Sequence, residues 1–571
     1  MTLTTGPRAE PLPELLPGVL EDATVFGRFR RTAARFPDRP FLAVLPETAE
    51  VYGIEPGEIT YGAMLEAVEA RAVLFAGAGY GAGHRVALLL QNRPDFLINW
   101  FALNALGVSV VPVNPDLRSA ELEYLIGHSE ASLVVAIPER VEELAAAAEA
   151  AGTGTGRIAP VISPKDAIPA PLRPAASPYG AASDTTSDRT KECALLYTSG
   201  TTGRPKGCVL TNDYFLLAGE WYATVGGLSA LHVEPAERML TPLPVFHMNA
   251  MAYSVMAMMT VGGSICILDR FHPRSWWASV RGFGATVVHY LGVMPAMLMS
   301  AAPSPADRDH KVRFGFGAGV DRTLHAPFEE RFGFPLLEAW AMTETGAGAV
   351  VMASTEPRKI GTSCFGKPGP EMDIVIRRED GSEAGTDEPG ELLVRRAGPD
   401  PRRGFFREYL KDAEATTAAW AGGYLNTGDV VSRDADGRLH FMDRKKNVIR
   451  RSGENISAVE VEAVLLTHPD VRQVAVAPTP DPVRGDEVVA LVVPESVPAD
   501  EGGARLLAED IVRFCLSRLA YYKAPGFVAF VSSIPLTSTE KIQRGALKVA
   551  VEEAIASGRA LDTCAMKKRT A

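Results

Sequence analysis

The sequence predicts an α/β protein: a large N-terminal domain of two doubly wound αβ subdomains plus a small β region, then a small mobile α+β C-terminal domain. Short apolar runs alternate with helical segments over most of the chain, which is typical of parallel sheets with crossover helices. After Gly366 the pattern changes to short β segments separated by turns, which predicts the β region. Beyond Phe441–Lys446 the chain is long enough for one more compact domain.

Length and composition are those of a globular chain with more than one domain. It has 571 residues, of which 46% are apolar, and its formal net charge of −11 argues against a nucleic-acid surface. The six cysteines show neither metal-ligand spacing nor a Cys-x-x-Cys pair, which favours unpaired thiols in a reducing, cytoplasmic compartment. Residues 241–268 carry no charge, but prolines and glycines interrupt them, so we expect a loop, a buried helix and a strand and no stable membrane insertion.

The N-terminal part predicts a loosely held tail and then alternating helices and strands. Residues 1–23 form the tail, and Val25–Phe36 reads as an amphipathic helix with Arg28, Arg30 and Arg31 on its outward face. Further along we expect strands over 59–61, 85–90, 108–113 and 133–137, helices up to residue 78 and over 93–106, and a surface linker over 145–190.

The stretch Tyr197–Gly207 (YTSGTTGRPKG) is suited to hold a polyphosphate. Three glycines and five hydroxyl side chains favour exposed main-chain N–H groups, and Lys206 supplies positive charge. A buried strand is expected just before it, and Thr211 and Asn212 are good helix N-caps, so we expect a strand, a phosphate loop and a helix. The spacing is not that of a Walker loop, and a Gly/Ser/Thr-rich linker is the alternative interpretation.

The remaining pattern places further strands and the domain boundaries. We expect strands over 264–268, 286–289 and 312–316 in the large domain, and elements over 458–467, 471–477, 488–493 and 511–519 in the small one. The predicted division is a tail over 1–23, a large domain over 24–444 and a small domain over 445–571.

Several motifs, in this order along the chain, resemble those of the adenylate-forming superfamily of acyl-CoA synthetases, peptide-synthetase adenylation domains and firefly luciferase. They are the phosphate loop, Trp340–Glu344 (WAMTE), Tyr424–Asp429 (YLNTGD) and Pro535–Arg544 (PLTSTEKIQR). The closest likeness is to carnitine/crotonobetaine-CoA ligase-like acyl-CoA synthetases, through RRSGENIS at 450–457, VEVE at 459–462 and PVFH at 244–247.

The resemblance implies an ATP site. Trp340 would stack on adenine, Thr343 would contact the α-phosphate and Glu344 would hold Mg²⁺, although Trp and Ala stand where the family has Tyr and Gly. Asp429 would accept the ribose hydroxyls, helped by Arg444. A capped helix start at Thr343 and an ordinary turn at Asp429 are the alternatives. The other nucleotide-binding positions implied are Thr198, Ser199, Gly200, Thr201, Thr202, Gly203, Lys206, Gly317, Ala318, Gly319 and Met342.

The resemblance also assigns residues to the acid and to a second half-reaction. Lys541 would bridge the acyl carboxylate and ATP, although Glu540 replaces the family's glycine and an exposed lysine is the alternative. Lys446 would be the hinge about which the small domain rotates, bringing Arg450 and Gly453 to the pantetheine path. His247, together with the stretches 247–252, 290–294 and 346–348, would line the acid pocket, with small residues at 346–348 leaving room for a bulky acyl group.

Together these motifs imply an ATP-dependent acid:CoA ligase. A carboxylic acid would be activated as acyl-AMP with release of pyrophosphate and then transferred to coenzyme A, with ATP, Mg²⁺ and CoA as cofactors. The alternatives are loading of a carrier-protein phosphopantetheine, non-catalytic nucleotide binding and luciferase-like oxygenation. His247 argues for an acid without an α-amino group, because amino-acid-activating domains carry an aspartate there. A carrier protein and a homodimer stay open as partners.

Overall fold

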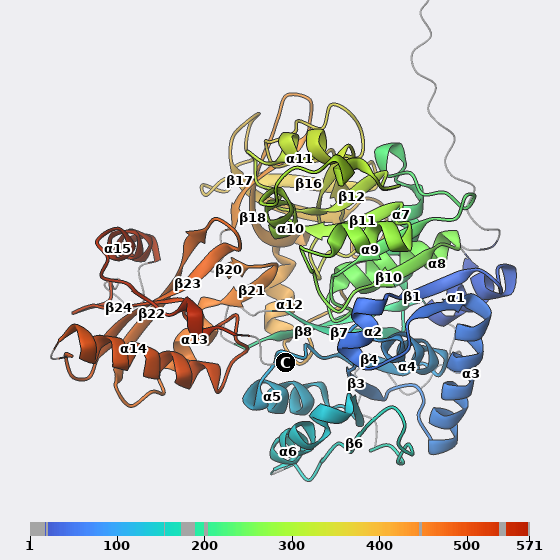
Figure 1. Cartoon of the computed structure of the whole chain (residues 1–571), viewed down its shortest axis with the longest axis horizontal. Helices are drawn as coiled ribbons and strands as arrows, with labels where there is room; N and C mark the ends of the chain where they lie inside the picture. The colour runs from blue at the N-terminus through green and yellow to red at the C-terminus, as the bar shows by residue number, and fades with distance from the viewer. Residues whose placement is uncertain are drawn as a thin grey trace, which may run out of the picture.

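The computed structural model describes Gly18 and residues 21–153, 155–172, 189–198, 204–444, 448–498, 500–535 and 544–568. These residues form four β-sheets flanked by helices, three in a large N-terminal part and one in a smaller C-terminal part (Figure 1). The predicted fold class is therefore confirmed. The predicted boundary at residue 445 falls at 445–447, outside the described residues, and stays a prediction.

The first sheet has six strands in the order β6-β5-β3-β4-β7-β8. Its strands are buried apolar runs joined in parallel, apart from the antiparallel pair β7–β8, as expected for a sheet covered by helices. They are β3 (Arg85–Leu89), β4 (Ser109–Pro112), β5 (Leu133–Ala136), β6 (Val161–Ile162), β7 (Glu192–Thr198) and β8 (Lys206–Thr211).

The second sheet has eight strands in the order β14-β13-β12-β11-β9-β10-β1-β2, with antiparallel strands at both edges. The early strand β1 pairs with β10 more than 200 residues later, with Leu42 opposite Ile265. The strands are β1 (Pro40–Val44), β2 (Gly57–Thr60), β9 (Arg238–Thr241), β10 (Ser264–Ile267), β11 (Val287–Leu291), β12 (Phe314–Ala318), β13 (Leu336–Trp340) and β14 (Val351–Met352).

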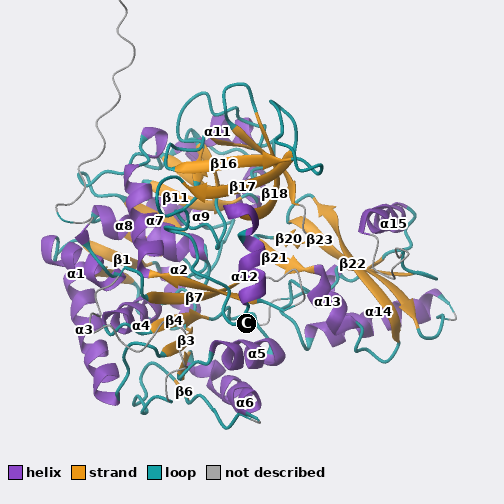
Figure 2. Ribbon diagram, turned by 180° about the vertical axis from the view of Figure 1, so that it is seen from behind, coloured by secondary structure: helices purple, strands orange, loops and turns teal. Residues whose placement is uncertain are grey.

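Helices pack against both of these sheets (Figure 2). The prediction of a surface linker over 145–190 is wrong in part, because residues up to Gly152 continue a helix and 161–162 join the first sheet. The helices are α1 (Val25–Arg35), α2 (Pro46–Tyr52), α3 (Tyr61–Ala78), α4 (Pro94–Ala105), α5 (Ser119–Ser129), α6 (Val141–Gly152), α7 (Asn212–Thr224), α8 (Met256–Val261), α9 (Trp276–Phe283), α10 (Val293–Met299), α11 (His325–Phe332) and α12 (Ala413–Ala419).

The third sheet is antiparallel, in the order β15-β19-β18-β17-β16, and matches the predicted β region. The fourth sheet forms the small part, where α13 and α14 pack on one face and α15 on the other. The elements are β15 (Cys364–Gly366), β16 (Met372–Arg377), β17 (Gly390–Arg396), β18 (Leu425–Arg433), β19 (Leu439–Arg444), β20 (Val448–Arg451), β21 (Glu454–Ser457), α13 (Ala458–Leu465), β22 (Val471–Asp481), β23 (Gly485–Pro494), α14 (Glu501–Leu516), β24 (Phe527–Phe530), α15 (Arg544–Ala556) and β25 (Leu561–Asp562).

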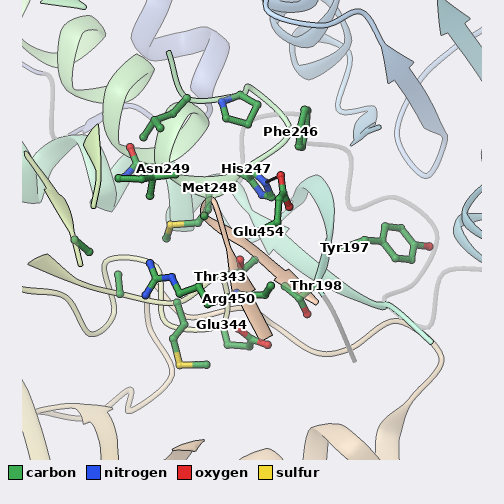
Figure 3. Close-up of a pocket in the computed structure, with 18 of the residues that line it drawn as sticks. Tyr197, Thr198, Phe246, His247, Met248, Asn249, Thr343, Glu344, Arg450 and Glu454 are labelled. Atoms are coloured by element: carbon green, nitrogen blue, oxygen red, sulfur yellow. Dashed lines mark hydrogen bonds and ion pairs between the residues drawn. The ribbon is translucent and has the colours of Figure 1, made fainter. Parts of the chain in front are cut away.

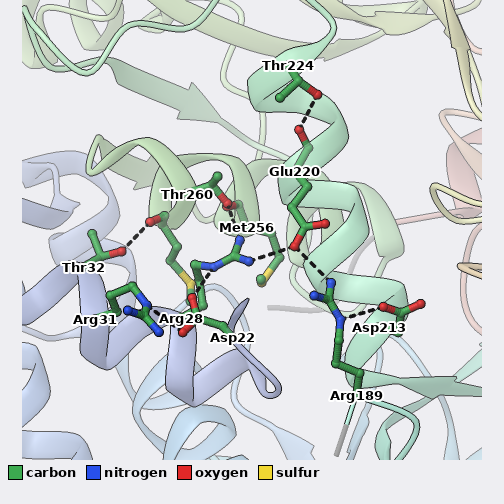
Figure 4. A network of polar contacts seen from close by, with 11 residues as sticks. Asp22, Arg28, Arg31, Thr32, Arg189, Asp213, Glu220, Thr224, Met256 and Thr260 are labelled. Carbon is green, nitrogen blue, oxygen red and sulfur yellow. Dashed lines mark hydrogen bonds and ion pairs between the residues drawn. The ribbon is translucent and has the colours of Figure 1, made fainter. Parts of the chain in front are cut away.

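The first helix carries an arginine that the sequence places wrongly. Arg28 is fully buried, not outward, and its guanidinium donates to Asp22 Oδ2 (2.8 Å) and Glu220 Oε1 (2.9 Å). A third bond goes to Thr260 of α8 (Figure 4). Two carboxylates satisfy the buried charge, so this arginine ties α1 to α7 and α8 instead of facing water.

Residues 241–268 form a loop, helical turns and a strand, as predicted. Of the helices described, none is long and apolar enough to cross a membrane. The helical part begins as a π-helix, Asn249–Val255, which runs on into α8. Short π-helical segments are rare and often occur at functional sites.

Candidate active site

A cavity of about 460 Å³ lies where the large sheets meet the small C-terminal part. It is lined by β7, by the turn after β9, by the ends of β12 and β13, by β18 and by the β20–β21 hairpin (Figure 3). The carboxyl ends of parallel strands and the turns that follow them are where ligands bind in open α/β sheets.

The structure brings most of the predicted site residues to this cavity. Ser199, Gly200, Thr201, Thr202, Gly203, Lys446 and Lys541 lie outside the described residues. Arg444 ends β19, where its backbone pairs with Asp429 on β18, so these two positions predicted for the ribose are neighbours. Those that line the cavity are Thr198, Lys206, His247, Gly317, Ala318, Gly319, Trp340, Met342, Thr343, Glu344, Asp429, Arg450 and Gly453.

The phosphate loop differs from its predicted setting. Thr198 ends β7 and Lys206 opens β8, and the two residues are partners in an antiparallel hairpin. A strand therefore follows the loop, and the expected helix α7 starts only at Asn212, with Thr211 as its N-cap. Because the helix begins a strand's length away, its dipole does not act on the loop, and the described flank offers phosphate the charges of Lys206 and the exposed Arg204.

Trp340 contacts the residue predicted to bind ribose. Its Nε1–H donates to Asp429 Oδ2 at 2.9 Å, and both side chains are buried. Trp340 thus fixes one oxygen of the carboxylate, a contact across 89 residues that no local pattern could show. The indole N–H of Trp340 therefore holds the Asp429 carboxylate in place. This hydrogen bond is stronger than one between neutral groups, because its acceptor is charged.

Replacing Trp340 with phenylalanine should therefore weaken nucleotide binding without removing the ring that would face adenine. We expect AMP affinity to fall about tenfold or more, the value of one hydrogen bond to a charged group. Titration calorimetry with AMP measures it. An unchanged dissociation constant would show that Asp429 needs no support from Trp340.

Glu344 is placed to hold a cation. Tyr409 O–H donates to Glu344 Oε1 at 2.8 Å, and the carboxylate is buried at the cavity wall. Lys206 Nζ lies 4.8 Å from the centre of the Tyr409 ring. The second carboxylate oxygen has no hydrogen bond among the described residues, so the side chain fits the role of a Mg²⁺ ligand beside a phosphate. Sequence reasoning missed Tyr409.

One close backbone approach and one buried carboxylate shape the wall formed by Gly317–Gly319. A Cβ at Gly317 would overlap the carbonyl oxygen of Tyr290, so this glycine is required by packing against β11. Glu338, also missed from the sequence, accepts hydrogen bonds from the N–H groups of Gly319 (2.9 Å) and Val320 (2.7 Å). Burial raises the pKa of Glu338, while these two bonds oppose the rise.

The small part reaches the cavity through its β20–β21 hairpin. Gly453 adopts φ +89°, and a Cβ there would overlap Leu291 Cδ1 of the large part. The next residue, Glu454, accepts a bond from His247 Nε2 at 3.2 Å (Figure 3). Burial lowers the pKa of His247, but attraction to Glu454 and their hydrogen bond together raise it above its ordinary value.

A buried ion triad also joins the two parts. Lys523 Nζ of the small part lies 2.6 Å from Glu121 Oε1 on α5 and 2.9 Å from Glu460 Oε1 on α13. Glu121 Oε2 accepts the N–H of Ala520 at 2.9 Å, and Asn114 Nδ2 donates to the Tyr522 hydroxyl at 3.1 Å. Glu121 belongs to the large part, whereas Glu460 belongs to the small part, as Lys523 does.

Comparison with known proteins identifies the family. The model of the AMP-binding enzyme matches residues 29–410, and that of the AMP-binding enzyme C-terminal domain matches residues 460–541. The first match alone spans more than half of the chain. The chain belongs to the AMP-binding enzyme family.

Named relatives of this AMP-binding enzyme agree with the predicted likeness. A crotonobetaine/carnitine–CoA ligase from Citrobacter koseri is 30% identical over 529 residues, covering 88% of this chain and 97% of that protein. Among solved structures, an o-succinylbenzoate CoA synthetase from Bacillus subtilis with a bound product analogue has a TM-score of 0.75 at 24% identity, covering 91% of this chain and 98% of that chain. The predicted superfamily is confirmed.

A second structure of the same Bacillus synthetase, in complex with ATP and magnesium ion, has a TM-score of 0.60 at 24% identity, covering 91% of this chain and 99% of that chain.

Two of the three stretches that were expected at the acid pocket reach the cavity, and the third does not. His247, Met248, Asn249 and Leu291 line the cavity. The stretch 346–348 does not widen it, because a Cβ at Gly346 would overlap Tyr214, and one at Gly348 would overlap Phe405. These glycines allow close packing inside the large part and leave no space for an acyl group.

The His247–Glu454 pair should make the stability of the contact between the large and small parts depend on pH. Its contribution is fully present below the ordinary histidine pKa of about 6.5 and is lost as pH rises through the raised pKa of the paired ring. The rate of thioester formation from supplied acyl-AMP should therefore drop most on Glu454→Gln at low pH, with the wild-type-to-variant ratio declining as pH rises. Rates measured between about pH 5.5 and 9 test this. A ratio that increases with pH would contradict it.

Proposed function

We propose that this AMP-binding enzyme is an ATP-dependent acid:CoA ligase that forms acyl-AMP and then acyl-CoA. The observation that carries the proposal is the composition of one cavity wall. Asp429, Thr343 and Glu344 offer ribose, phosphate and metal contacts, and the β20–β21 hairpin brings Gly453 to the same space. The relative named as a CoA ligase supports acid–CoA ligation over loading of a carrier protein.

In the first half-reaction the chain binds and orients. Asp429 accepts the ribose hydroxyls and is held by Trp340, and the Thr343 hydroxyl donates to the α-phosphate. Mg²⁺ held by Glu344 would neutralise phosphate charge as the acid carboxylate attacks. No nucleophilic side chain is needed, because the acid itself forms the new bond and pyrophosphate leaves.

In the second half-reaction the chain admits a thiol. Gly453 lets the hairpin backbone approach Leu291 closely, and Arg450 lines the cavity as a positive charge. We assign to these residues the passage for the pantetheine arm of CoA and the contact with CoA, which accepts the acyl group. The thiol attacks the acyl carbonyl, and AMP leaves from the Asp429 side. The six cysteines are free thiols, which supports the predicted reducing compartment.

Pyrophosphate release over a panel of carboxylic acids, with CoA present and absent, tests the proposal. Acid-dependent release that accelerates with CoA and yields a thioester supports the ligase. Release that is unaffected by CoA but rises with a phosphopantetheinylated carrier protein favours the carrier alternative. Nucleotide binding without any release would contradict an enzymatic role.

A further inference from the structure

The acid pocket contains an asparagine whose orientation is set by buried groups. Asn249 opens the π-helix Asn249–Val255 and lines the cavity. Ser254 Oγ, five residues on, donates to the Asn249 carbonyl oxygen at 3.3 Å. The wide π turn thus fastens the Asn249 backbone at the point where its side chain meets the cavity.

Behind Asn249 lies the fully buried His289. Its Nδ1 is 2.9 Å from Asn249 Oδ1 and 2.9 Å from Ser254 Oγ, and its Nε2 is 3.1 Å from the Tyr222 hydroxyl. Burial lowers the pKa of His289 to about 3, so the ring is neutral and carries one N–H.

The hydrogen-bond inventory decides which nitrogen carries that proton. The buried Tyr222 hydroxyl needs an acceptor, and His289 Nε2 is the one within reach among the described residues. The proton is therefore on Nδ1, which donates to Asn249 Oδ1. The opposite assignment, with the amide of Asn249 flipped, would leave the buried Tyr222 O–H without an acceptor.

This assignment turns the amide nitrogen of Asn249 away from His289. Within the described part of the chain Nδ2 makes no hydrogen bond, and the side chain borders the cavity, so its N–H groups are available to a ligand. The polar side chains that flank Asn249 in the sequence and line the cavity are already bonded: His247 pairs with Glu454, and the Tyr253 hydroxyl donates to Gly346 O at 3.0 Å. The same cavity is also lined by apolar residues, Phe246, Met248, Leu291, Phe316 and Val350.

The carboxylates of the cavity lining are all engaged by protein groups. Five acidic residues of the described chain line it, and each accepts a hydrogen bond or forms an ion pair with another residue. Their partners are Lys523 for Glu121, Gly319 N–H for Glu338, Tyr409 for Glu344, Trp340 for Asp429 and His247 for Glu454. The free carboxylate oxygen of Glu344 is assigned to Mg²⁺, so a cationic acyl group would find no uncommitted carboxylate here, and the positive edge of the Asn249 amide would repel it.

We propose that the acid selected by this enzyme carries a neutral hydrogen-bond acceptor, such as a ketone or ether oxygen, that accepts from Asn249 Nδ2. This inference rests on the proposed acid:CoA ligase function. It separates the chain from the trimethylammonium acids in the name of its relative, because such a head group offers no acceptor to the amide.

Matched acids test the selection. Pyrophosphate release is measured for ω-1 oxo acids of increasing chain length, for ω-1 methyl acids of the same length, and for carnitine and crotonobetaine. The oxo acid should exceed its methyl isostere in kcat/KM by about 10- to 100-fold at the best length, because the isostere leaves the amide unpaired. The two trimethylammonium acids should be the poorest substrates.

Variants at Asn249 give the second arm. Asn249→Leu should abolish or reverse the oxo preference while AMP affinity and the unfolding temperature stay near those of the wild type, and Asn249→Asp should improve the trimethylammonium acids. Ser254→Ala is the matched control: it removes the bond to the Asn249 carbonyl oxygen but leaves the Asn249–His289 bond that orients the amide, so it should retain the preference. Asn249→Ala replaces the leucine variant if the latter does not fold.

Failure of the ligase function and failure of the Asn249 assignment give different results. If no acid of any class releases pyrophosphate although AMP binds, the proposed function is wrong. If acids react but the methyl isosteres or the trimethylammonium acids are preferred, or if Asn249→Leu keeps the oxo preference, the ligase function stands and the assignment of Asn249 is overturned.

Discussion

Replacing Gly453 with valine is expected to stop thioester formation while acyl-AMP continues to form. Gly453 has φ +89°, and its missing Cβ would overlap Leu291 across the boundary between the two parts. A valine would push the β20–β21 hairpin out of the cavity, and displacement of about 1 Å at a reacting centre costs about 100-fold in rate. Adenylation does not require this hairpin at the cavity in the proposed cycle.

A matched glycine separates this contact from backbone strain. Gly437 also has a positive φ (+81°), but no atom lies within 4 Å of a Cβ built there. Gly437→Val should therefore keep both half-reactions. Rapid-quench measurement of acyl-AMP and acyl-CoA in both variants checks the prediction, and equal loss of both products in Gly453→Val would disprove the split.

Lys541→Ala should produce the opposite split. By its resemblance Lys541 neutralises charge as the acid attacks ATP, and losing one such group typically lowers the rate by about 100- to 1,000-fold. Thioester formation from supplied acyl-AMP should persist, because this lysine is assigned only to the first half-reaction. Lys541 lies outside the described residues. The helix that begins three residues later, α15, packs on the face of the small sheet that α13 and α14 do not cover (Figure 1).

The control for this prediction is another lysine nearby. Lys548 is exposed on α15, so Lys548→Ala removes a similar charge without an assigned role. It should leave acid-dependent pyrophosphate release unchanged. If Lys541→Ala also retained full release, the resemblance around Glu540 would not extend to the function of the lysine.

Local pattern was enough to predict most strands and helices, because apolar periodicity reports burial directly. It could not show that β1 joins a sheet with β10, since strand pairing across more than 200 residues leaves no local trace. It also placed Arg28 on the surface, because two of the three partners that make this buried arginine tolerable, Glu220 on α7 and Thr260 on α8, lie about 200 residues away along the chain.

In the candidate site, too, the sequence predicted the residues within motifs but not their distant contacts. Motifs predicted Asp429, Thr343 and Glu344, which all line the cavity. The residues that hold them came from the structure alone: Tyr409 contacts Glu344 from 65 positions away. The glycines at 346–348 misled in a different way, because a small residue marks close approach without saying whether a ligand or another chain segment approaches.

The ion triad has a consequence for the energy of domain exchange. In the proposed exchange, in which the small part moves away, Lys523 would keep Glu460 as a counter-ion, and Glu121 would still accept the N–H of Arg118 at the start of its own helix. Neither side is left with a stranded buried ammonium, so separation avoids the several kcal/mol that an unpaired buried charge would cost. The two arrangements can therefore lie close in free energy, and binding of one substrate or the other is enough to choose between them.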